Sequence, residues 1–178
     1  MARVTQAGHR HFDYGVPVVV IGAGAAGMIA ALAAHEDGAE VLVLERDPLP
    51  RGSTALSAGL VPAPATRWQA AAGIADTPEL FARDIMSKAH GEPDPDIVSF
   101  AAASVGPVLE WLADAHGLDF SVVDDFTYPG HSARRMHGLP SRSGEAFIDA
   151  LGQPEGRAGI PEGCAPHVTG PFADGAGR

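Results

Sequence analysis

The stretch Val16-Pro-Val-Val-Val-Ile-Gly-Ala-Gly-Ala-Ala-Gly27 decides the fold of this chain. Its first half, up to Ile21, is a β-branched apolar run, which predicts a strand covered on both faces, as in a parallel sheet. Gly22 ends that strand. The Ala-rich segment 25–37 then predicts a buried helix, which Gly38 closes in the C′ position.

The same stretch contains the pattern G-x-G-x-x-G at the point where the strand turns into the helix. Gly22 permits the tight turn, Gly24 lets a pyrophosphate approach the backbone, and Gly27 lets the helix pack close to the strand. Ala25 and Ala26 belong to the first helical turn, whose free N–H groups and positive dipole end favour phosphate. The pattern therefore predicts a dinucleotide-binding turn.

A second apolar strand, Glu40–Leu44, completes a strand–helix–strand unit. Glu45 follows this strand, 21 residues after Gly24. An acid at this place hydrogen-bonds the ribose of the adenosine. Because its carboxylate repels a 2′-phosphate, NADP is disfavoured, and FAD and NAD remain open.

Composition excludes several other classes of protein. The chain has 178 residues, enough for one domain, and a net charge of −10. No basic cluster is longer than Arg134-Arg135, which argues against a nucleic-acid partner. The single cysteine, Cys164, excludes an intrachain disulfide and a CxxC site, and fits a reducing compartment. The uncharged run over 16–34 is explained by a strand, a turn and a helix, so we expect no membrane span, no signal peptide and a cytoplasmic location.

Start and stop signals divide most of the remaining chain into short helices. Thr77 before Pro78 is an N-cap followed by a first helical residue, and Asp94 before Pro95 repeats the signal. Pro154 ends the last helix, because proline costs a helix interior about 3 kcal/mol. We expect helices over 77–89, 94–104, 107–117 and 143–151, a strand over 120–123 and a short strand over 167–169.

Residues 18–59 resemble the FAD-binding start of the fumarate reductase/succinate dehydrogenase flavoprotein superfamily, whose members include ketosteroid dehydrogenases and urocanate reductase. That family follows the ribose acid with the loop G-G-N/S-S/T-x-x-S-x-G. Here the loop reads Arg51-Gly-Ser-Thr-Ala-Leu-Ser-Ala-Gly59, with arginine in place of the first glycine. The stretch Gly130-His-Ser-Ala-Arg-Arg-Met-His-Gly-Leu-Pro-Ser-Arg-Ser-Gly144 is also similar to one in the family.

The resemblance implies an α/β fold, a Rossmann-type FAD-binding βαβ segment with a mostly helical insertion after residue 60. It divides the chain into a flexible leader (1–15), the N-terminal part of an FAD-binding domain (16–151) and a Gly/Pro-rich continuation (152–178). No histidine occurs between His35 and His90, so FAD is expected to be non-covalent. The expected cofactor contacts are Gly22, Gly24, Ala25, Ala26, Gly27, Glu45, Arg46, Ser53, Thr54, Ser57, Ala58, Gly59 and Val168.

The implied activity is hydride transfer at an activated carbon–carbon bond of a small-molecule substrate. Members of the family are much longer, and their capping domain and catalytic residues follow the region that this chain resembles. We therefore expect a truncated front part, with the remainder of the same polypeptide as its partner, and assign no catalytic residue and no metal site. The alternatives are an NAD-binding Rossmann domain of a dehydrogenase and an inactive truncated fragment.

Other polar residues have simpler interpretations. Arg134, Arg135 and Arg142 are taken as surface charges, with approach to an anionic substrate as the alternative. His131 and His137 lack metal-ligand spacing and are expected to face solvent or pack in loops.

Overall fold

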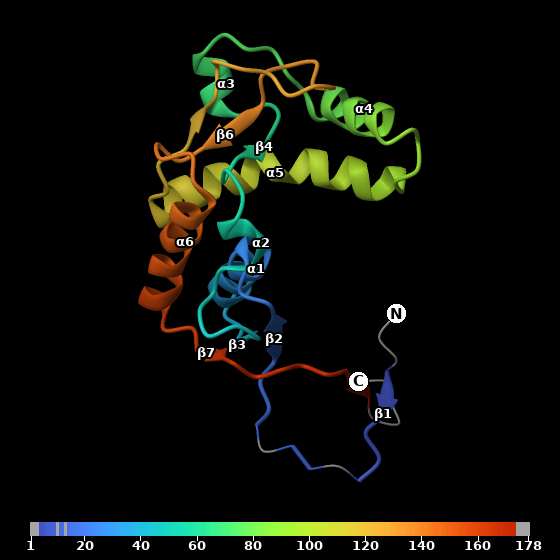
Figure 1. The fold of residues 1–178 in the computed structure, drawn as a ribbon, viewed down its shortest axis with the longest axis vertical. Helices are drawn as coiled ribbons and strands as arrows, with labels where there is room; N and C mark the ends of the chain where they lie inside the picture. The colour runs from blue at the N-terminus through green and yellow to red at the C-terminus, as the bar shows by residue number, and fades with distance from the viewer. Residues whose placement is uncertain (1–3, 10, 13, 174–178) are drawn as a thin grey trace. The chain divides into compact units, whose positions relative to one another are not determined.

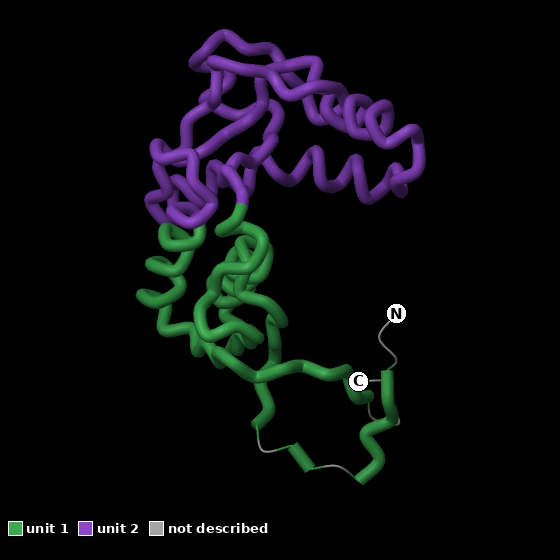
Figure 2. Tube along the Cα trace, viewed as in Figure 1, with its two compact units in different colours: residues 1–56, 148–178 green, residues 57–147 purple. Residues whose placement is uncertain are grey.

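The computed structural model describes residues 4–9, 11–12 and 14–173. The chain forms two compact units, residues 1–56 with 148–178 (unit 1) and residues 57–147 (unit 2), and each is described by itself (Figure 2). The elements of unit 1 are β1 (Thr5–Gln6), β2 (Val18–Ile21), α1 (Ala25–Glu36), β3 (Val41–Glu45), α2 (Gly52–Ala55), β7 (Glu162–Cys164) and β8 (Phe172–Ala173) (Figure 1). Those of unit 2 are β4 (Val61–Pro62), α3 (Arg67–Ala71), α4 (Pro78–Lys88), α5 (Pro95–His116), β5 (Ser121–Val122) and β6 (Met136–Gly138), and α6 (Gly144–Ala158) begins in unit 2 and ends in unit 1.

Unit 1 is built on a parallel three-stranded sheet in the order β2-β3-β7. Val18 pairs with Val41, and Val43 pairs with Glu162. Helix α1 connects β2 to β3 and contacts both strands. It ends at Glu36 with Asp37 as its C-cap, and Gly38 follows in the C′ position with φ +87°. The predicted α/β fold and its strand–helix–strand unit are therefore confirmed.

The prediction that the first strand is covered on both faces is wrong. Val19 is 48% exposed and Ile21 is 66% exposed. Strand β2 lies at the edge of the sheet among the described residues. The side chains of alternate residues point to opposite faces of a strand, and α1 covers only one of these faces. By contrast, the central strand β3 buries Val41 and Val43.

The C-terminal part of unit 1 also differs from expectation. Helix α6 continues through Pro154 to Ala158. Apolar packing explains this, because Leu151, Pro154 and Ile160 are all buried, and burial of apolar side chains outweighs an unfavourable propensity. Residues 167–169 form no strand, and β7 takes that place a few residues earlier.

The two ends of the described chain meet in a short parallel pair, in which β1 pairs with β8. The sequence predicts neither strand. The flexibility of residues 1–15 remains a prediction.

Unit 2 combines three helices with a small antiparallel sheet in the order β4-β6-β5. The structure confirms the helix capped by Thr77, which accepts a hydrogen bond from the Leu80 N–H. It contradicts the prediction of two helices over 94–117, because α5 is continuous through Pro107. Leu109 and Leu112 are buried after the proline, and Gly106 lets the helix approach the Pro64 carbonyl, which a Cβ would meet at 2.7 Å.

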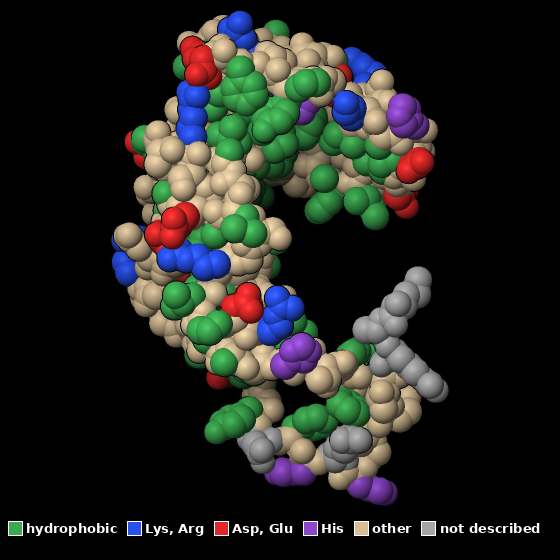
Figure 3. All heavy atoms as spheres, viewed as in Figure 1, with side chains coloured by type: hydrophobic (Ala, Val, Ile, Leu, Met, Phe, Trp, Pro, Cys, Tyr) green, Lys and Arg blue, Asp and Glu red, His purple; other side chains and the backbone are tan. Residues whose placement is uncertain are grey.

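Helix α5 is long and apolar enough to cross a membrane by length and composition. Core helices pass the same test, so this is a weak indication. Two of its apolar side chains, Ile97 and Phe100, are exposed, and hydrophobic side chains reach the surface in several places of unit 2 (Figure 3). The uncharged run over 16–34 forms β2, a turn and most of α1, as predicted.

Candidate functional site

The turn between β2 and α1 depends on two glycines. Gly22 has φ +100°, a backbone conformation that favours glycine, and its N–H donates to the Leu44 carbonyl over 2.8 Å. A Cβ on Gly27 would lie 1.8 Å from the Gly22 carbonyl oxygen. Because no side chain fits at that distance, Gly27 is required for the helix to begin beside the strand, as predicted.

The N-terminus of α1 presents backbone donors. Gly24 is its N-cap and provides no side-chain cap, and the first turn has no acidic residue. Within the helix, the first hydrogen bond runs from the Met28 N–H to the Gly24 carbonyl. The N–H groups of Ala25, Ala26 and Gly27 precede that ladder and have no partner within the helix. Together with the dipole of a twelve-residue helix, they favour an anion.

The loop at α2 lies against this turn. Thr54 Oγ1 accepts a hydrogen bond from the Ala25 N–H over 3.1 Å, and a Cβ on Gly24 would lie 3.6 Å from the same oxygen. Gly52 has φ +52° and comes close to the Gly24 Cα. Ser53, which lies between Gly52 and Thr54 in the chain, is exposed. The structure therefore brings Thr54 to the glycine turn, and the cofactor contact of Ser53 remains a prediction.

Arg51, which replaces the first glycine of the family pattern, points to another partner. Its Nη1 donates to Asp149 Oδ1 of helix α6 over 2.5 Å. The departure from the pattern thus supplies a contact between this loop and α6 within unit 1.

The Glu45 carboxylate is held at the end of β3 by backbone amides. The Ala23 N–H donates to Oε2 over 2.8 Å, and the Asp47 N–H donates to Oε1 over 2.9 Å. The hydrogen bond from Asp47, followed by that from Ala23, holds the pKa of Glu45 below its ordinary value although the residue is buried. An ionised carboxylate has about four acceptor positions, so positions remain for ribose hydroxyls.

The remaining predicted contacts are not brought to the glycine turn by any described interaction. Ser57, Ala58 and Gly59 open unit 2. There the Gly59 N–H donates to Ser57 Oγ, and a Cβ on Gly59 would lie 2.6 Å from the Ser143 carbonyl. Close packing therefore explains Gly59 without a ligand. Arg46 is exposed beside Asp47. Val168 is exposed and lies outside any strand, so the strand on which its prediction rested is absent there, and its cofactor contact remains a prediction.

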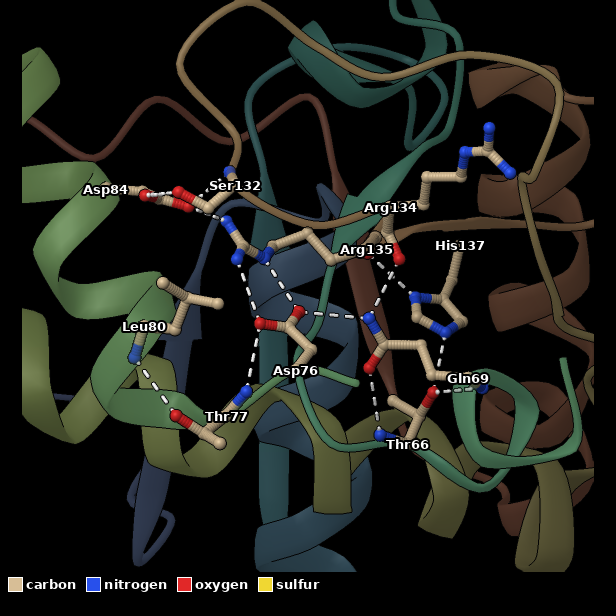
Figure 4. Close-up of polar contacts among 10 residues, drawn as sticks. All are labelled: Thr66, Gln69, Asp76, Thr77, Leu80, Asp84, Ser132, Arg134, Arg135 and His137. Atoms are coloured by element: carbon tan, nitrogen blue, oxygen red, sulfur yellow. Dashed lines mark hydrogen bonds and ion pairs between the residues drawn. The ribbon is translucent and has the colours of Figure 1, made fainter. Parts of the chain in front are cut away.

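Unit 2 contains a buried polar network that the sequence interpretation misses (Figure 4). Arg135 is fully buried, so its interpretation as a surface charge is wrong. Its Nε and Nη2 donate to the two carboxylate oxygens of Asp76, both over 2.9 Å, and its Nη1 donates to Asp84. We call this network the Arg135 cluster, made of Thr66, Gln69, Asp76, Asp84, Ser132, Arg135 and His137.

The Arg135 cluster is satisfied internally. Burial raises the pKa of Asp84, but hydrogen bonds from Ser132 and the ion pair with Arg135 outweigh it, and the net pKa is lowered. Burial lowers the pKa of His137, whose Nε2 contacts Thr66 Oγ1 over 2.8 Å. The carboxylates lie 51 and 59 residues from Arg135 in the chain. No local pattern could have identified the cluster, and its saturated contacts make it structural.

The comparison with known proteins agrees with the geometry of unit 1, which is that of a Rossmann-type dinucleotide-binding domain. Residues 17–160 match the family model described as FAD binding domain. Since this match covers most of the chain, the protein belongs to that family, and FAD is its cofactor. This decides between the two dinucleotides that the glycine pattern and Glu45 left open.

Its relatives include fumarate and urocanate reductases. The NADH:fumarate oxidoreductase of Klebsiella pneumoniae is 37% identical over 120 residues, which are 67% of this chain and 13% of that protein. The urocanate reductase of Eggerthella lenta is 37% identical over 136 residues, 76% of this chain and 22% of that protein. The chain thus spans between 13% and 22% of the length of these two relatives.

Solved structures share the fold. The open conformation of a flavocytochrome c3 fumarate reductase superposes with a TM-score of 0.76 and 30% identity, covering 84% of this chain and 26% of that one. A 3-ketosteroid dehydrogenase from Rhodococcus jostii superposes with a TM-score of 0.81 over 100% of this chain and 43% of that one. At 23% identity, the second match shows the fold alone.

Proposed function

We propose that this FAD-binding domain serves a flavoenzyme that transfers a hydride at an activated carbon–carbon bond of a small molecule. Bound FAD supplies the hydride chemistry, and the protein supplies binding and orientation. Support for the reaction comes from the relatives, which are named for fumarate and urocanate reduction. The rest of the flavoenzyme would supply the catalytic residues, since this chain covers only a small part of those relatives.

The observation that carries the proposal is that one turn holds two binding groups of opposite sign, the positive end of the α1 dipole and the Glu45 carboxylate. The N-terminus of α1 offers N–H groups to a pyrophosphate, and Glu45 offers an ionised carboxylate to ribose hydroxyls. The Ala23 N–H joins them, because it lies in the glycine turn and donates to Glu45 Oε2. An anion-binding end and a hydroxyl-binding acid held by the same turn match the two parts of an adenosine diphosphate group.

Within this proposal, each residue has a stated task. Ala26 and Gly27 offer their amides to the pyrophosphate, and Ala25, whose amide donates to Thr54 Oγ1, is proposed to contact the ligand beside them. Ser53 contributes its exposed hydroxyl to the same ligand. For the remaining residues, cofactor contact is proposed from the family resemblance alone: Arg46, Ser57, Ala58, Gly59 and Val168.

The first experiment is a visible spectrum of the purified protein, with any released cofactor identified by chromatography. We expect a flavin spectrum, and FAD that is released intact by denaturation, because we propose non-covalent binding. A folded, colourless protein that does not bind added FAD would overturn the proposal. A Ser57→Leu variant separates FAD from NAD, since only the FAD interpretation requires the loop that contains Ser57.

The reaction itself is tested on the complete polypeptide. Its flavin is reduced without oxygen and then mixed with fumarate, urocanate or an unsaturated 3-ketosteroid. Reoxidation of the flavin by one of these, with saturation of its carbon–carbon double bond, supports hydride transfer. If reoxidation by any acceptor leaves every carbon–carbon double bond intact, the proposed reaction is wrong.

We further propose a cytoplasmic location. Cys164 is a free, exposed thiol, and such thiols persist in reducing compartments. Fractionation of cells that express the complete protein tests this, and recovery in a membrane pellet would contradict it.

A further inference from the structure

Helix α2 carries the hydroxyls of Ser53 and Thr54 but buries none of its own residues. It has only four residues, and a helix of this length is not stable by itself in water. One contact joins it to the glycine turn, because Thr54 Oγ1 accepts the Ala25 N–H over 3.1 Å. The place of α2 against the turn therefore depends on polar contacts rather than on a buried apolar face.

A second contact joins α2 to helix α6. Arg51 is the N-cap of α2, and its Nη1 donates to Asp149 Oδ1 over 2.5 Å. The Arg51 carbonyl accepts a hydrogen bond from the Ala55 N–H over 3.2 Å, which closes the short helix. Arg51 therefore holds α2 through its backbone and anchors it through its side chain to a helix of 15 residues.

Apolar packing does not fill the space between this loop and α6. A cavity of about 390 Å³ lies there, and its lining includes Leu49 and Pro50 before α2 and Ile148 of α6. Arg51 and Asp149 belong to the same lining. Side chains that border a hollow have few partner atoms across it and gain little dispersion energy there. The ion pair is therefore a tether that close packing does not replace.

We propose that Arg51 is a positioning residue for FAD. Its ion pair with Asp149 holds α2 against the glycine turn, so that Thr54 meets the Ala25 N–H before the cofactor arrives. Preorganised groups need less ordering when a ligand binds, and this strengthens binding. The inference rests on the proposed place of the pyrophosphate at the N-terminus of α1. Arg51 stands where the family pattern has glycine, which has no side chain to form such a tether.

Arg51→Gln tests the tether by titration of the full chain with FAD, followed by quenching of flavin fluorescence. FAD affinity should fall about two- to fivefold, a small factor because both side chains of the pair are partly exposed. At about 1 M sodium chloride the difference between the variant and the unchanged protein should shrink, since salt screens the pair. Arg157→Gln is the matched control, because Arg157 is an exposed cation of the same helix α6, and FAD affinity should stay unchanged.

Asp149→Asn distinguishes positioning from direct contact with the cofactor. If Arg51 acts through the ion pair, loss of either partner weakens FAD binding by a similar factor, and Arg51→Lys, which keeps the charge, retains most of the affinity. If the Arg51 guanidinium bound the phosphates itself, Asp149→Asn would leave FAD affinity unchanged or increase it. That result would overturn the proposal.

The Thr54→Val background tests whether Arg51 acts through Thr54. In this background Arg51→Gln should change FAD affinity by less than about 1.5-fold, because the group that Arg51 positions is gone and the two substitutions are coupled. An equal loss of affinity with and without the Thr54 hydroxyl would contradict the proposed role.

Amide hydrogen exchange of the protein without FAD provides a readout that does not depend on cofactor binding. The Ala25 N–H should exchange faster in Arg51→Gln, because its hydrogen bond to Thr54 opens more often. The Met28 N–H, which donates to the Gly24 carbonyl within α1, should exchange at an unchanged rate. Equal exchange of the Ala25 N–H in both proteins would overturn the proposal whether or not FAD binds, and faster exchange at both amides would indicate a general loss of structure instead.

Discussion

The FAD-binding turn of unit 1 and the Arg135 cluster of unit 2 differ in how completely their polar groups are hydrogen-bonded within the protein. At the turn, no helix carbonyl accepts the first N–H groups of α1. Thr54 Oγ1 accepts the Ala25 N–H, whereas the N–H groups of Ala26 and Gly27 have no partner within the helix. In the cluster, Arg135 directs three nitrogens to two buried carboxylates. Groups without internal partners gain most from a ligand, whereas saturated groups stabilise the fold. The difference separates a binding site from a structural network in the same chain.

The largest effect is expected in the cluster. Arg135→Met leaves Asp76 and Asp84 without their cation, and removal of one partner from a buried ion pair costs about 3–5 kcal/mol. Urea denaturation followed by circular dichroism measures the loss. Arg134→Met is the matched control, because Arg134 is exposed and should change stability by less than about 0.5 kcal/mol. Similar losses in both variants would contradict the structural role of the cluster.

The next effect concerns the turn. Gly27→Ala places a Cβ 1.8 Å from the Gly22 carbonyl oxygen, so the helix must move away from the strand. FAD affinity should fall by about 100-fold or more, since displacement of the anion-binding amides removes charge-assisted hydrogen bonds. Flavin fluorescence quenching measures this. The control is Gly152→Ala, where a Cβ meets nothing within 4 Å, and FAD affinity should be unchanged.

The third prediction compares two buried carboxylates: Glu45 accepts two backbone hydrogen bonds, whereas Glu155 accepts none. Burial, followed by the negative charge of Glu162, raises the pKa of Glu155 from its ordinary value of about 4.5 to about 7, so folding favours its protonated form. Its contribution to stability is complete below pH 4.5 and is lost as the pH rises to about 7. Glu155→Gln should therefore be more stable than the unchanged protein at pH 8, by about 2–3 kcal/mol, and equal to it at pH 4. A stability difference that is the same at both pH values would contradict it.

The fourth prediction concerns the acid at the end of β3. Glu45→Gln keeps an acceptor but removes the charge, and FAD affinity should fall by about tenfold. The pKa of Glu45 is lowered in the folded state. Its stabilisation is therefore present above its unfolded pKa and lost as the pH falls through the folded value. Unchanged FAD affinity in the variant would show that the ribose lies elsewhere.

The smallest effect is expected at Thr54. Thr54→Val removes the oxygen that accepts the Ala25 N–H while keeping the shape of the side chain. FAD affinity should fall about three- to tenfold, because one neutral hydrogen bond contributes about 1 kcal/mol. Thr169→Val is a suitable control, since Thr169 is exposed outside the turn. No difference between the two variants would remove Thr54 from the site.

Sequence patterns predicted the elements whose signals are local. The strand–helix–strand unit and the Gly38 closure follow from residues that are neighbours in the chain, and so does the helix capped by Thr77. The failures share a different cause. Pro107 and Pro154 are strong local stop signals, yet both helices continue because buried residues on either side of each proline stabilise them.

The sequence alone therefore determined the class of the protein and the chemistry of its cofactor turn, because three glycines and one acid act through backbone geometry over a short span. The tertiary structure decided which charges are buried. Arg135 and Arg134 are adjacent and chemically identical, but only Arg135 meets carboxylates from distant segments. Glu155 is likewise indistinguishable in sequence from an exposed glutamate. Burial and pairing depend on contacts between segments far apart in the chain, which no local pattern encodes.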